Sequence, residues 1–296
     1  MKIIIIGCGM IGISHLKSLL NSNGTYEILI IDKKKRLDEL KKLLSPKRNL
    51  SLNFNSKIPN DKNFDFAIIS TNSTERYKVF KTLIEKNKIK YILLEKFIFS
   101  KIMEYKKFNK FFKKYNKKIM VNSFGSYLFR NCGIKKEEKK PVNIFVTVKE
   151  GTLFTGMIHY FDFFYLFTKK KIKIDLSKIN KIVHSKRSNY FEGLGEIYAF
   201  NSKGSIKIST SKKVDLEINF KIKKINYKLI LKKNNFLLFK NNKFNKEFSF
   251  PFAYKITAKL INNNKNFLKN FHYLSQISID ILRSLKKKYR KEIFIT

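Results

Sequence analysis

The chain has 296 residues, of which 43% are hydrophobic, including 29 Phe and 14 Tyr, and this apolar content excludes wholesale disorder. The formal charge is +42, yet only seven of the 64 basic residues are Arg, so the excess comes from Lys. Lys, Ile, Asn and Phe are all abundant and all spelled by A/T-rich codons, so we favour genome composition over nucleic-acid binding as the source of the charge.

The first 120 residues alternate between predicted strands and helices. Continuous apolar runs such as Lys2–Ile6 are typical of strands buried on both faces of a parallel sheet. Strands joined by helices imply right-handed crossovers, so we predict an α/β fold with a doubly wound, Rossmann-type parallel sheet over residues 1–122. Strands are expected at Lys2–Ile6, Glu27–Ile31, Leu50–Phe54, Phe64–Ser70, Ile89–Leu94 and Lys118–Asn122, and helices at Ile11–Leu20, Leu37–Leu44, Thr74–Asn87 and Met103–Lys114.

The pattern changes after Asn122. A strand is predicted at Val142–Lys149 and a helix at Gly156–Lys169, and period-2 alternation dominates from Ile179 to Phe250. We therefore predict a second, α+β domain over 123–296, with a mainly antiparallel, open-faced sheet that serves substrate binding and oligomerisation. Because an open sheet face must be covered, a homo-oligomer, dimer or tetramer, is expected. A closing helix is marked by Phe267, Phe271, Leu274, Ile281 and Leu285, and turns are expected at 232–235 and 262–266.

Targeting, membrane and metal signals are weak. The apolar run at the N-terminus is too short for a signal peptide. The stretch Phe154–Phe167 contains His159 and Asp162 and falls below the ~20 apolar residues that a membrane span needs. Cys8 and Cys132 form no metal-ligand pair. A cytoplasmic protein without a metal site or membrane partner is the expectation.

A glycine motif follows the first predicted strand. Residues 7–12 read Gly-Cys-Gly-Met-Ile-Gly, the G-x-G-x-x-G spacing that opens dinucleotide-binding helices. Gly7 would allow the tight turn, Gly9 the approach of a pyrophosphate and Gly12 close helix–strand packing. Backbone N–H groups at the start of the helix, including those of Met10 and Ile11, would bind the phosphates.

The residues at and after the end of the second predicted strand bear on whether the cofactor is NAD or NADP. Asp32 lies 20 residues after Gly12, where a carboxylate can accept hydrogen bonds from a ribose diol and repel a 2′-phosphate. Lys33–Arg36 follow at once and could hold that phosphate instead. We predict NAD, with NADP as the alternative.

Polar residues also follow two later strands. Thr71 and Asn72 come after the fourth strand, and Glu95 and Lys96 end the fifth. Ligands of open α/β sheets bind at the carboxyl ends of the strands, so we expect these four residues to contact the cofactor.

With these motifs the chain resembles the glucose–fructose oxidoreductase / inositol dehydrogenase (Gfo/Idh/MocA) family over essentially its whole length. The most specific parts are residues 7–20, with His15 in G-x-x-H-x-x-x-L, and the Glu95-Lys96 pair. His15 itself is expected to serve packing.

The resemblance implies a reaction and its residues. Lys96 would contact both nicotinamide and substrate and stabilise negative charge on the reacting oxygen. His159 would be the acid/base, since a His side chain titrates near neutral pH. Asn122 and Thr155 stand where family members place residues near the substrate. Asp162 matches the Asp of the family's His-x-x-Asp motif, and either a substrate contact or a structural role is expected for it.

Four positions depart from the family pattern. Asn72 and Phe97 replace Pro, Arg76 replaces His, and Thr155 replaces Asp. The leading prediction is an NAD(P)-dependent oxidoreductase acting on a hydroxyl or keto carbon of a sugar, sugar nucleotide or cyclitol. The substitutions around Thr155 resemble those of family members that accompany surface-glycan synthesis, which suggests such a role. The departures keep open a catalytically inactive, dinucleotide-binding regulator or partner, and the charge alone keeps open a nucleic-acid binder, although no nucleic-acid partner is expected.

Overall fold

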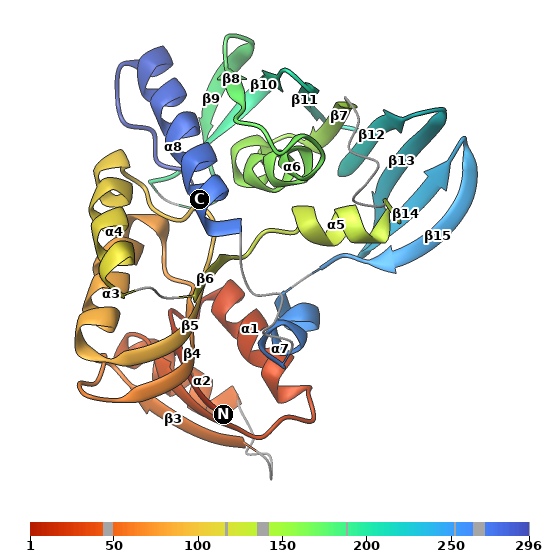
Figure 1. The fold of residues 1–296 in the computed structure, drawn as a ribbon. Coiled ribbons are helices and arrows are strands. Elements are labelled where there is room, and N and C mark those ends of the chain that lie inside the picture. The colour runs from red at the N-terminus through yellow and green to blue at the C-terminus, as the bar shows by residue number, and fades with distance from the viewer. Residues whose placement is uncertain are drawn as a thin grey trace. The chain divides into compact units, whose positions relative to one another are not determined.

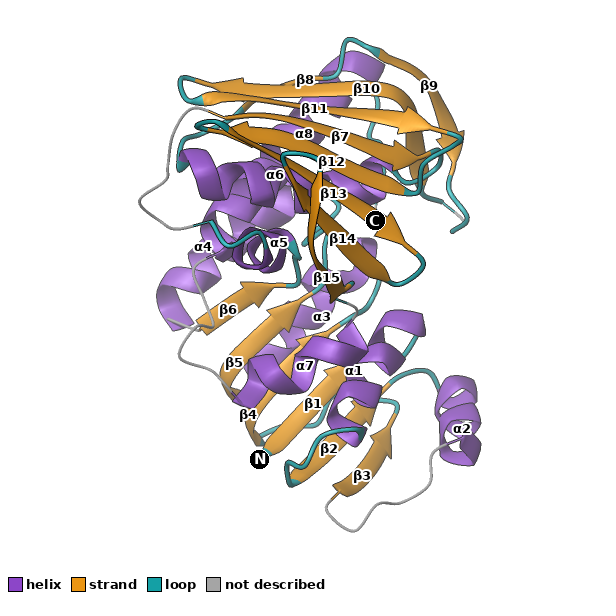
Figure 2. Ribbon diagram, turned by 90° about the vertical axis from the view of Figure 1, so that its right-hand side faces the viewer, coloured by secondary structure: helices purple, strands orange, loops and turns teal. Residues whose placement is uncertain are grey.

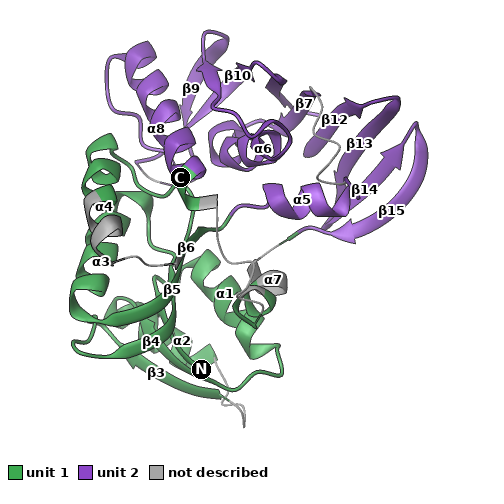
Figure 3. Cartoon of the chain, in the orientation of Figure 1, with its two compact units in different colours: residues 1–122, 251–272 green, residues 123–250, 273–296 purple. Residues whose placement is uncertain are grey.

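The computed structural model describes residues 1–43, 50–115, 118–134, 142–187, 189–251, 253–262 and 270–295. They form two compact units, 1–122 with 251–272 and 123–250 with 273–296 (Figure 3). Leu44, Phe267 and most of the predicted turn at 262–266 lie outside the described residues.

Unit 1 is built on a six-stranded sheet in the order β3-β2-β1-β4-β5-β6 (Figure 1). Every neighbouring pair is parallel, and the strand order reverses between β1 and β4, the position at which such sheets bind ligands. The predicted doubly wound parallel sheet is therefore confirmed. Its strands are β1 (Lys2–Ile6), β2 (Tyr26–Ile31), β3 (Leu50–Asn55), β4 (Asn63–Ile69), β5 (Lys88–Leu94) and β6 (Lys118–Val121), and its helices α1 (Met10–Leu20), α2 (Lys34–Leu43), α3 (Ser73–Lys86), α4 (Ile102–Tyr115) and α7 (Ala253–Asn262).

Helix α7 joins unit 1 from far along the chain and lies beside α1 (Figures 1 and 2). Ala258 and Ile261 are buried in the same core as Leu16, and the Ala258 N–H donates to Ser18 Oγ at 2.9 Å. The predicted boundary at Asn122 assigns this segment to the second domain, whereas in the structure its apolar side chains complete the cover of α1.

Unit 2 contains a nine-stranded sheet in the order β15-β14-β13-β12-β7-β11-β10-β8, with β9 paired to β10. All pairs are antiparallel except β7 with β11, which confirms the predicted mainly antiparallel sheet. The strands are β7 (Val142–Lys149), β8 (Lys173–Asp175), β9 (Ile179–His184), β10 (Phe191–Asn201), β11 (Gly204–Ser211), β12 (Leu216–Ile222), β13 (Ile225–Lys232), β14 (Asn235–Lys240) and β15 (Lys243–Ser249).

Helix α6 (Leu153–Thr168) packs on β7, β10 and β11 of this sheet, and α5 (Gly125–Asn131) packs on α6 (Figure 2). Burial alternates along β7, where Ile144 is buried and Phe145 is 54% exposed, so one face of the sheet meets α6 and the other is open. A homo-oligomer that covers the open face stays a prediction. From Tyr273 onward, α8 (Asn270–Tyr289) also belongs to unit 2. None of the described helices is long and apolar enough to cross a membrane.

Candidate functional site

The glycine loop of residues 7–12 connects β1 to α1, and its glycines serve different purposes. Gly7 has φ +88°, and a Cβ there would lie 2.7 Å from Thr71 N. A Cβ on Gly12 would lie 2.0 Å from the Gly7 carbonyl oxygen. At Gly9, by contrast, φ is −65° and a Cβ would meet no described atom within 4 Å. The fold requires glycine at 7 and 12, whereas only a ligand would require it at 9.

Helix α1 starts at this loop without a side-chain cap. Its N-cap is Gly9, and Met10 is 80% exposed. The first backbone N–H groups of a helix have no intrahelical acceptor and carry the positive end of its dipole. The predicted phosphate contacts of Met10 and Ile11 therefore lie at a helix end suited to an anion.

Asp32 is fixed beside the same loop. Its Oδ2 accepts from the Cys8 N–H at 2.5 Å and its Oδ1 from the Lys33 N–H at 2.7 Å. Arg36 Nε donates to the Cys8 carbonyl at 3.0 Å, so this residue of the basic cluster reaches the loop. Burial raises the pKa of the Cys8 thiol to about 12, which keeps it protonated and unreactive. The loop thus offers a carboxylate for a ribose and a guanidinium close by.

Glu95, after β5, is held by two side chains of unit 1. His15 Nε2 lies 2.8 Å from its Oε1, and Asn122 Nδ2 donates to the same oxygen at 2.6 Å. The second ring nitrogen of His15 lies 2.8 Å from Thr257 Oγ1 on α7. His15 therefore makes buried hydrogen bonds as well as packing contacts, and the amide of Asn122 contacts Glu95, whereas the sequence predicted a substrate contact for Asn122.

Arg76 hydrogen-bonds backbone carbonyls in both of the segments that follow β4 and β5. Its buried guanidinium donates from Nη1 to the carbonyls of Glu95 at 2.6 Å and Phe97, and from Nη2 to the carbonyl of Thr71. Lys96 lies between two of these anchored residues, and its peptide bond to Phe97 is cis. Sequence reasoning recognised Arg76 only as a departure from the family pattern, because nothing in its spacing shows that it bonds backbone carbonyls.

His159 lies on α6, half-buried in unit 2. Its ring stacks on Phe124, with centroids 3.9 Å apart and planes inclined by 23°. The Phe124 N–H points at His159 Nδ1 at 3.4 Å, and Ser123 Oγ lies 3.3 Å from the same nitrogen. Two groups that the sequence analysis did not select, Ser123 and the Phe124 N–H, therefore orient the predicted acid/base.

Asp162, one turn further along α6, is fully buried. Burial raises its pKa above the ordinary range, although hydrogen bonds from Ser123 and Tyr273 oppose that effect. Tyr273 donates to Oδ1, and Oδ2 faces Gly125, where an added Cβ would lie 2.6 Å away. A carboxyl group with no exposed surface in unit 2 does not support the predicted substrate contact.

Thr155 bonds a carboxylate from another element. Its hydroxyl and its N–H both donate to Glu192 on β10, and Phe154 N–H donates to the same carboxylate at 2.7 Å. These are the N–H groups that a helix N-cap normally satisfies, and the N-cap Thr152 makes no such bond. Glu192 thus caps α6, the helix that carries His159.

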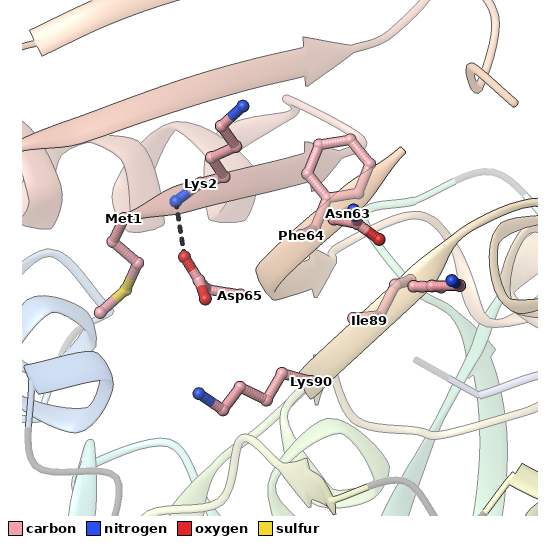
Figure 4. A pocket seen from close by; sticks show the side chains of 8 residues that line it. Met1, Lys2, Asn63, Phe64, Asp65, Ile89 and Lys90 are labelled. Atoms are coloured by element: carbon pink, nitrogen blue, oxygen red, sulfur yellow. Dashed lines mark hydrogen bonds between the residues drawn. The ribbon is translucent and has the colours of Figure 1, made fainter. Parts of the chain in front are cut away.

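A surface hollow of unit 1 lies at the opposite ends of the strands. It is lined by residues at the start of β1, β4 and β5, among them Lys2, Asp65 and Lys90 (Figure 4). The Lys2 N–H donates to Asp65 Oδ2 at 3.0 Å. Because the glycine loop follows the carboxyl end of β1, this hollow does not belong to the candidate cofactor site.

Residues 1–123 match the family model described as an oxidoreductase family with an NAD-binding Rossmann fold, GFO_IDH_MocA. These residues are similar to the GFO_IDH_MocA oxidoreductases. The resemblance to this family, and the dinucleotide cofactor inferred from the glycine loop, are thereby confirmed. A search of curated proteins gives no match.

Solved structures share the fold over nearly the whole chain. A putative NADPH-dependent oxidoreductase from Desulfitobacterium hafniense has a TM-score of 0.71 at 11% identity, covering 99% of this chain and 97% of its own. UDP-N-acetylglucosamine 3-dehydrogenase GnnA from Acidithiobacillus ferrooxidans has 0.67 at 10%, covering 96% and 97%. A super-repressor mutant of Gal80p from Saccharomyces cerevisiae has 0.65 at 13%, covering 98% and 96%. At these identities the likeness concerns the fold.

Proposed function

We propose that the protein is an NAD(P)-dependent oxidoreductase that interconverts a hydroxyl and a keto group on a sugar, sugar nucleotide or cyclitol. The observation that carries the proposal is Gly9, whose missing side chain leaves a space that the fold does not use. The fixed carboxylate of Asp32 and the uncapped start of α1 support it. When bound, the nicotinamide supplies or accepts the hydride.

The chain's own groups handle charge and protons. The ammonium group of Lys96 hydrogen-bonds the reacting oxygen and stabilises negative charge on it. His159 gives a proton to that oxygen during carbonyl reduction and takes one during alcohol oxidation. Arg76, through the carbonyls on either side of Lys96, keeps the Lys96 backbone in place. Thr71, Asn72 and Glu95 complete the proposed cofactor contacts at the ends of β4 and β5.

Gly9→Arg tests the cofactor site directly. Because a Cβ at this position meets no described atom within 4 Å, we expect an unchanged melting temperature together with loss of NADH and NADPH binding, measured by fluorescence titration. Gly12→Ala is the matched control, since its Cβ overlaps the Gly7 carbonyl and should lower the melting temperature instead. Binding of either dinucleotide to Gly9→Arg with wild-type affinity would contradict the site.

A screen of sugars, nucleotide sugars and cyclitols, followed by cofactor absorbance, tests the substrate class. Once a substrate is found, His159→Ala should lower the rate by roughly 10²–10⁴-fold if His159 is the acid/base.

The alternative is a dinucleotide-binding regulator, which the departures at Asn72, Arg76, Phe97 and Thr155 favour and which the likeness in fold to a super-repressor mutant of Gal80p supports. It predicts tight cofactor binding without turnover of any compound in the screen.

A further inference from the structure

Three charged side chains lie close to the glycine loop of unit 1. Asp32 directly follows β2, and Arg36 and Glu39 lie three residues apart on α2. Arg36 Nε donates to the Cys8 carbonyl at 3.0 Å, and its Nη1 donates to Glu39 Oε2 at 2.5 Å. The guanidinium is therefore held at two points, by the loop through Nε and by a carboxylate through Nη1.

The carboxylate of Asp32 keeps capacity for a ligand. Each of its oxygens accepts one backbone N–H, from Cys8 at 2.5 Å and from Lys33 at 2.7 Å. A carboxylate oxygen has two lone pairs, so each oxygen can accept one more hydrogen bond. The two hydroxyls of a ribose supply two donors, whereas a 2′-phosphate supplies none and repels the carboxylate. Asp32 alone therefore favours the unphosphorylated ribose.

A neighbouring cation can reverse that preference, and Arg36 is the cation in position to do so. Within the described residues, Arg36 is the member of the Lys33–Arg36 cluster whose side chain bonds the glycine loop, and the three lysines are exposed. A free guanidinium beside the loop would form charge-assisted hydrogen bonds with a phosphate. The carboxylate of Glu39 competes for these same donors.

The Arg36–Glu39 pair lies where a ligand can approach it. The side chain of Arg36 is 32% exposed and that of Glu39 is 46% exposed. Because Glu39 neutralises Arg36, the site beside the loop keeps the negative charge of Asp32. A phosphate would meet this charge and would also have to displace Glu39 from the guanidinium.

We propose that Glu39 is a specificity-determining residue that makes the site select NAD(H) over NADP(H), an inference that rests on the proposed function. Asp32 accepts the ribose hydroxyls, and Glu39 withholds the Arg36 guanidinium from a 2′-phosphate. The discrimination then depends on a residue outside the glycine motif, seven positions after Asp32.

Fluorescence titration with NADH and with NADPH tests the proposal without any substrate. The wild type should bind NADH more tightly than NADPH. In Glu39→Gln the Kd of NADPH should fall about tenfold, because the released guanidinium gains a charge-assisted bond to the phosphate. The Kd of NADH should not change. Glu85→Gln, which removes an exposed carboxylate paired with Lys81 on α3, is the matched control and should change neither Kd.

Arg36→Met in the Glu39→Gln background tests whether the gain passes through Arg36. The double variant should lose the improved NADPH binding, and the double-mutant cycle measures the coupling between the two positions. The ratio of the two Kd values is compared, since a loosened loop weakens both dinucleotides alike. If the double variant binds neither dinucleotide, Glu39→Gln alone decides.

A wild type that binds NADPH as tightly as NADH would overturn the proposal, as would an unchanged ratio of the two Kd values in Glu39→Gln. A gain in NADPH binding that persists without Arg36 would also contradict it. The selectivity and the proposed function fail separately. A preference for NADH that depends on Glu39, in a protein that turns over no compound of the screen, would support the selectivity and contradict the function. Turnover at equal rates and affinities with NADH and NADPH would do the reverse.

Discussion

Two buried carboxyl groups, Glu95 in unit 1 and Asp162 in unit 2, behave in opposite ways. Burial alone would raise the pKa of Glu95, but hydrogen bonds from His15 and Asn122, with the charge of Arg76, bring it below its ordinary value. For Asp162 the same burial prevails and the pKa stays raised. Desolvation therefore does not decide the charge of a buried acid by itself.

The difference lies in the donors around each group. Glu95 accepts two bonds at one oxygen and has a guanidinium nearby, so it is an anion at neutral pH beside the loop of Lys96. Asp162 accepts a hydrogen bond from the phenol of Tyr273 at one oxygen, and its other oxygen has no hydrogen-bond partner among the described residues. The first arrangement favours the carboxylate and the second favours the protonated acid.

Arg76→Met should have the largest effect on the free energy of unfolding. The change removes the donor for the carbonyls of Thr71, Glu95 and Phe97 and leaves the buried Glu95 carboxylate without its nearby charge. We expect a loss of about 4 kcal/mol in the free energy of unfolding, measured in urea. Arg283→Met, which removes an exposed guanidinium paired with Asp280, should cost under about 1 kcal/mol. Equal losses in the two variants would contradict the anchoring role of Arg76.

Glu95→Gln should cost about 3 kcal/mol at pH 7, because it removes the anion that Arg76 and His15 face. The folded-state pKa of Glu95 is lowered, so its contribution is present above the unfolded value of about 4.3 and is lost as the pH falls through the folded value. Urea titrations at pH 7 and pH 3 should show that the difference in free energy of unfolding between variant and wild type is smaller at pH 3. Glu39→Gln, at an exposed helix position, is the control.

Asp162→Asn should show the opposite pH dependence. Its folded-state pKa is raised, so its contribution is complete below the unfolded value of about 3.9 and is lost as the pH rises through the folded value. Relative to wild type, the variant should therefore gain free energy of unfolding as the pH rises from 4 to 9. If the wild type instead becomes more stable relative to the variant as the pH rises over this range, Asp162 is an anion in the folded state, as Glu95 is.

Glu192 is a third buried carboxylate, and Glu192→Gln allows its contribution to stability to be compared with those of Glu95 and Asp162. Because Glu192 caps α6 through the N–H groups of Phe154 and Thr155, the amide should keep part of the cap and cost about 1 kcal/mol. Thermal unfolding measures the loss, and Glu150→Gln at an exposed position is the control. A loss as large as that of Arg76→Met would mean that the Glu192 charge does more than cap the helix.

The sequence predicted the parallel sheet and the glycine loop because both depend on local patterns. A run such as Lys2–Ile6 followed by glycine spacing needs no knowledge of the rest of the chain. The sequence also predicted that Thr71 and Glu95 follow strands, since β4 and β5 are apolar runs with clear limits.

The surroundings of those residues could not be predicted. Ser123 contacts His159 over 36 positions, Glu192 contacts Thr155 over 37, and Arg76 bonds backbone carbonyls that any residue type could supply. Thr155 was interpreted through the Asp that it replaces, yet its hydroxyl bonds a carboxylate from β10. Only tertiary contacts bring these groups together, and no spacing rule encodes them.

The return of α7 to unit 1 has a consequence for synthesis of the protein. His15 meets Thr257 across 242 positions, and Ala258 meets Ser18 across 240. A ribosome that has finished the six-stranded sheet must still translate residues 123–250 of unit 2 before α7 emerges. During that interval α1 stands without its cover, so the nascent chain exposes an apolar helix surface on which chaperones can act.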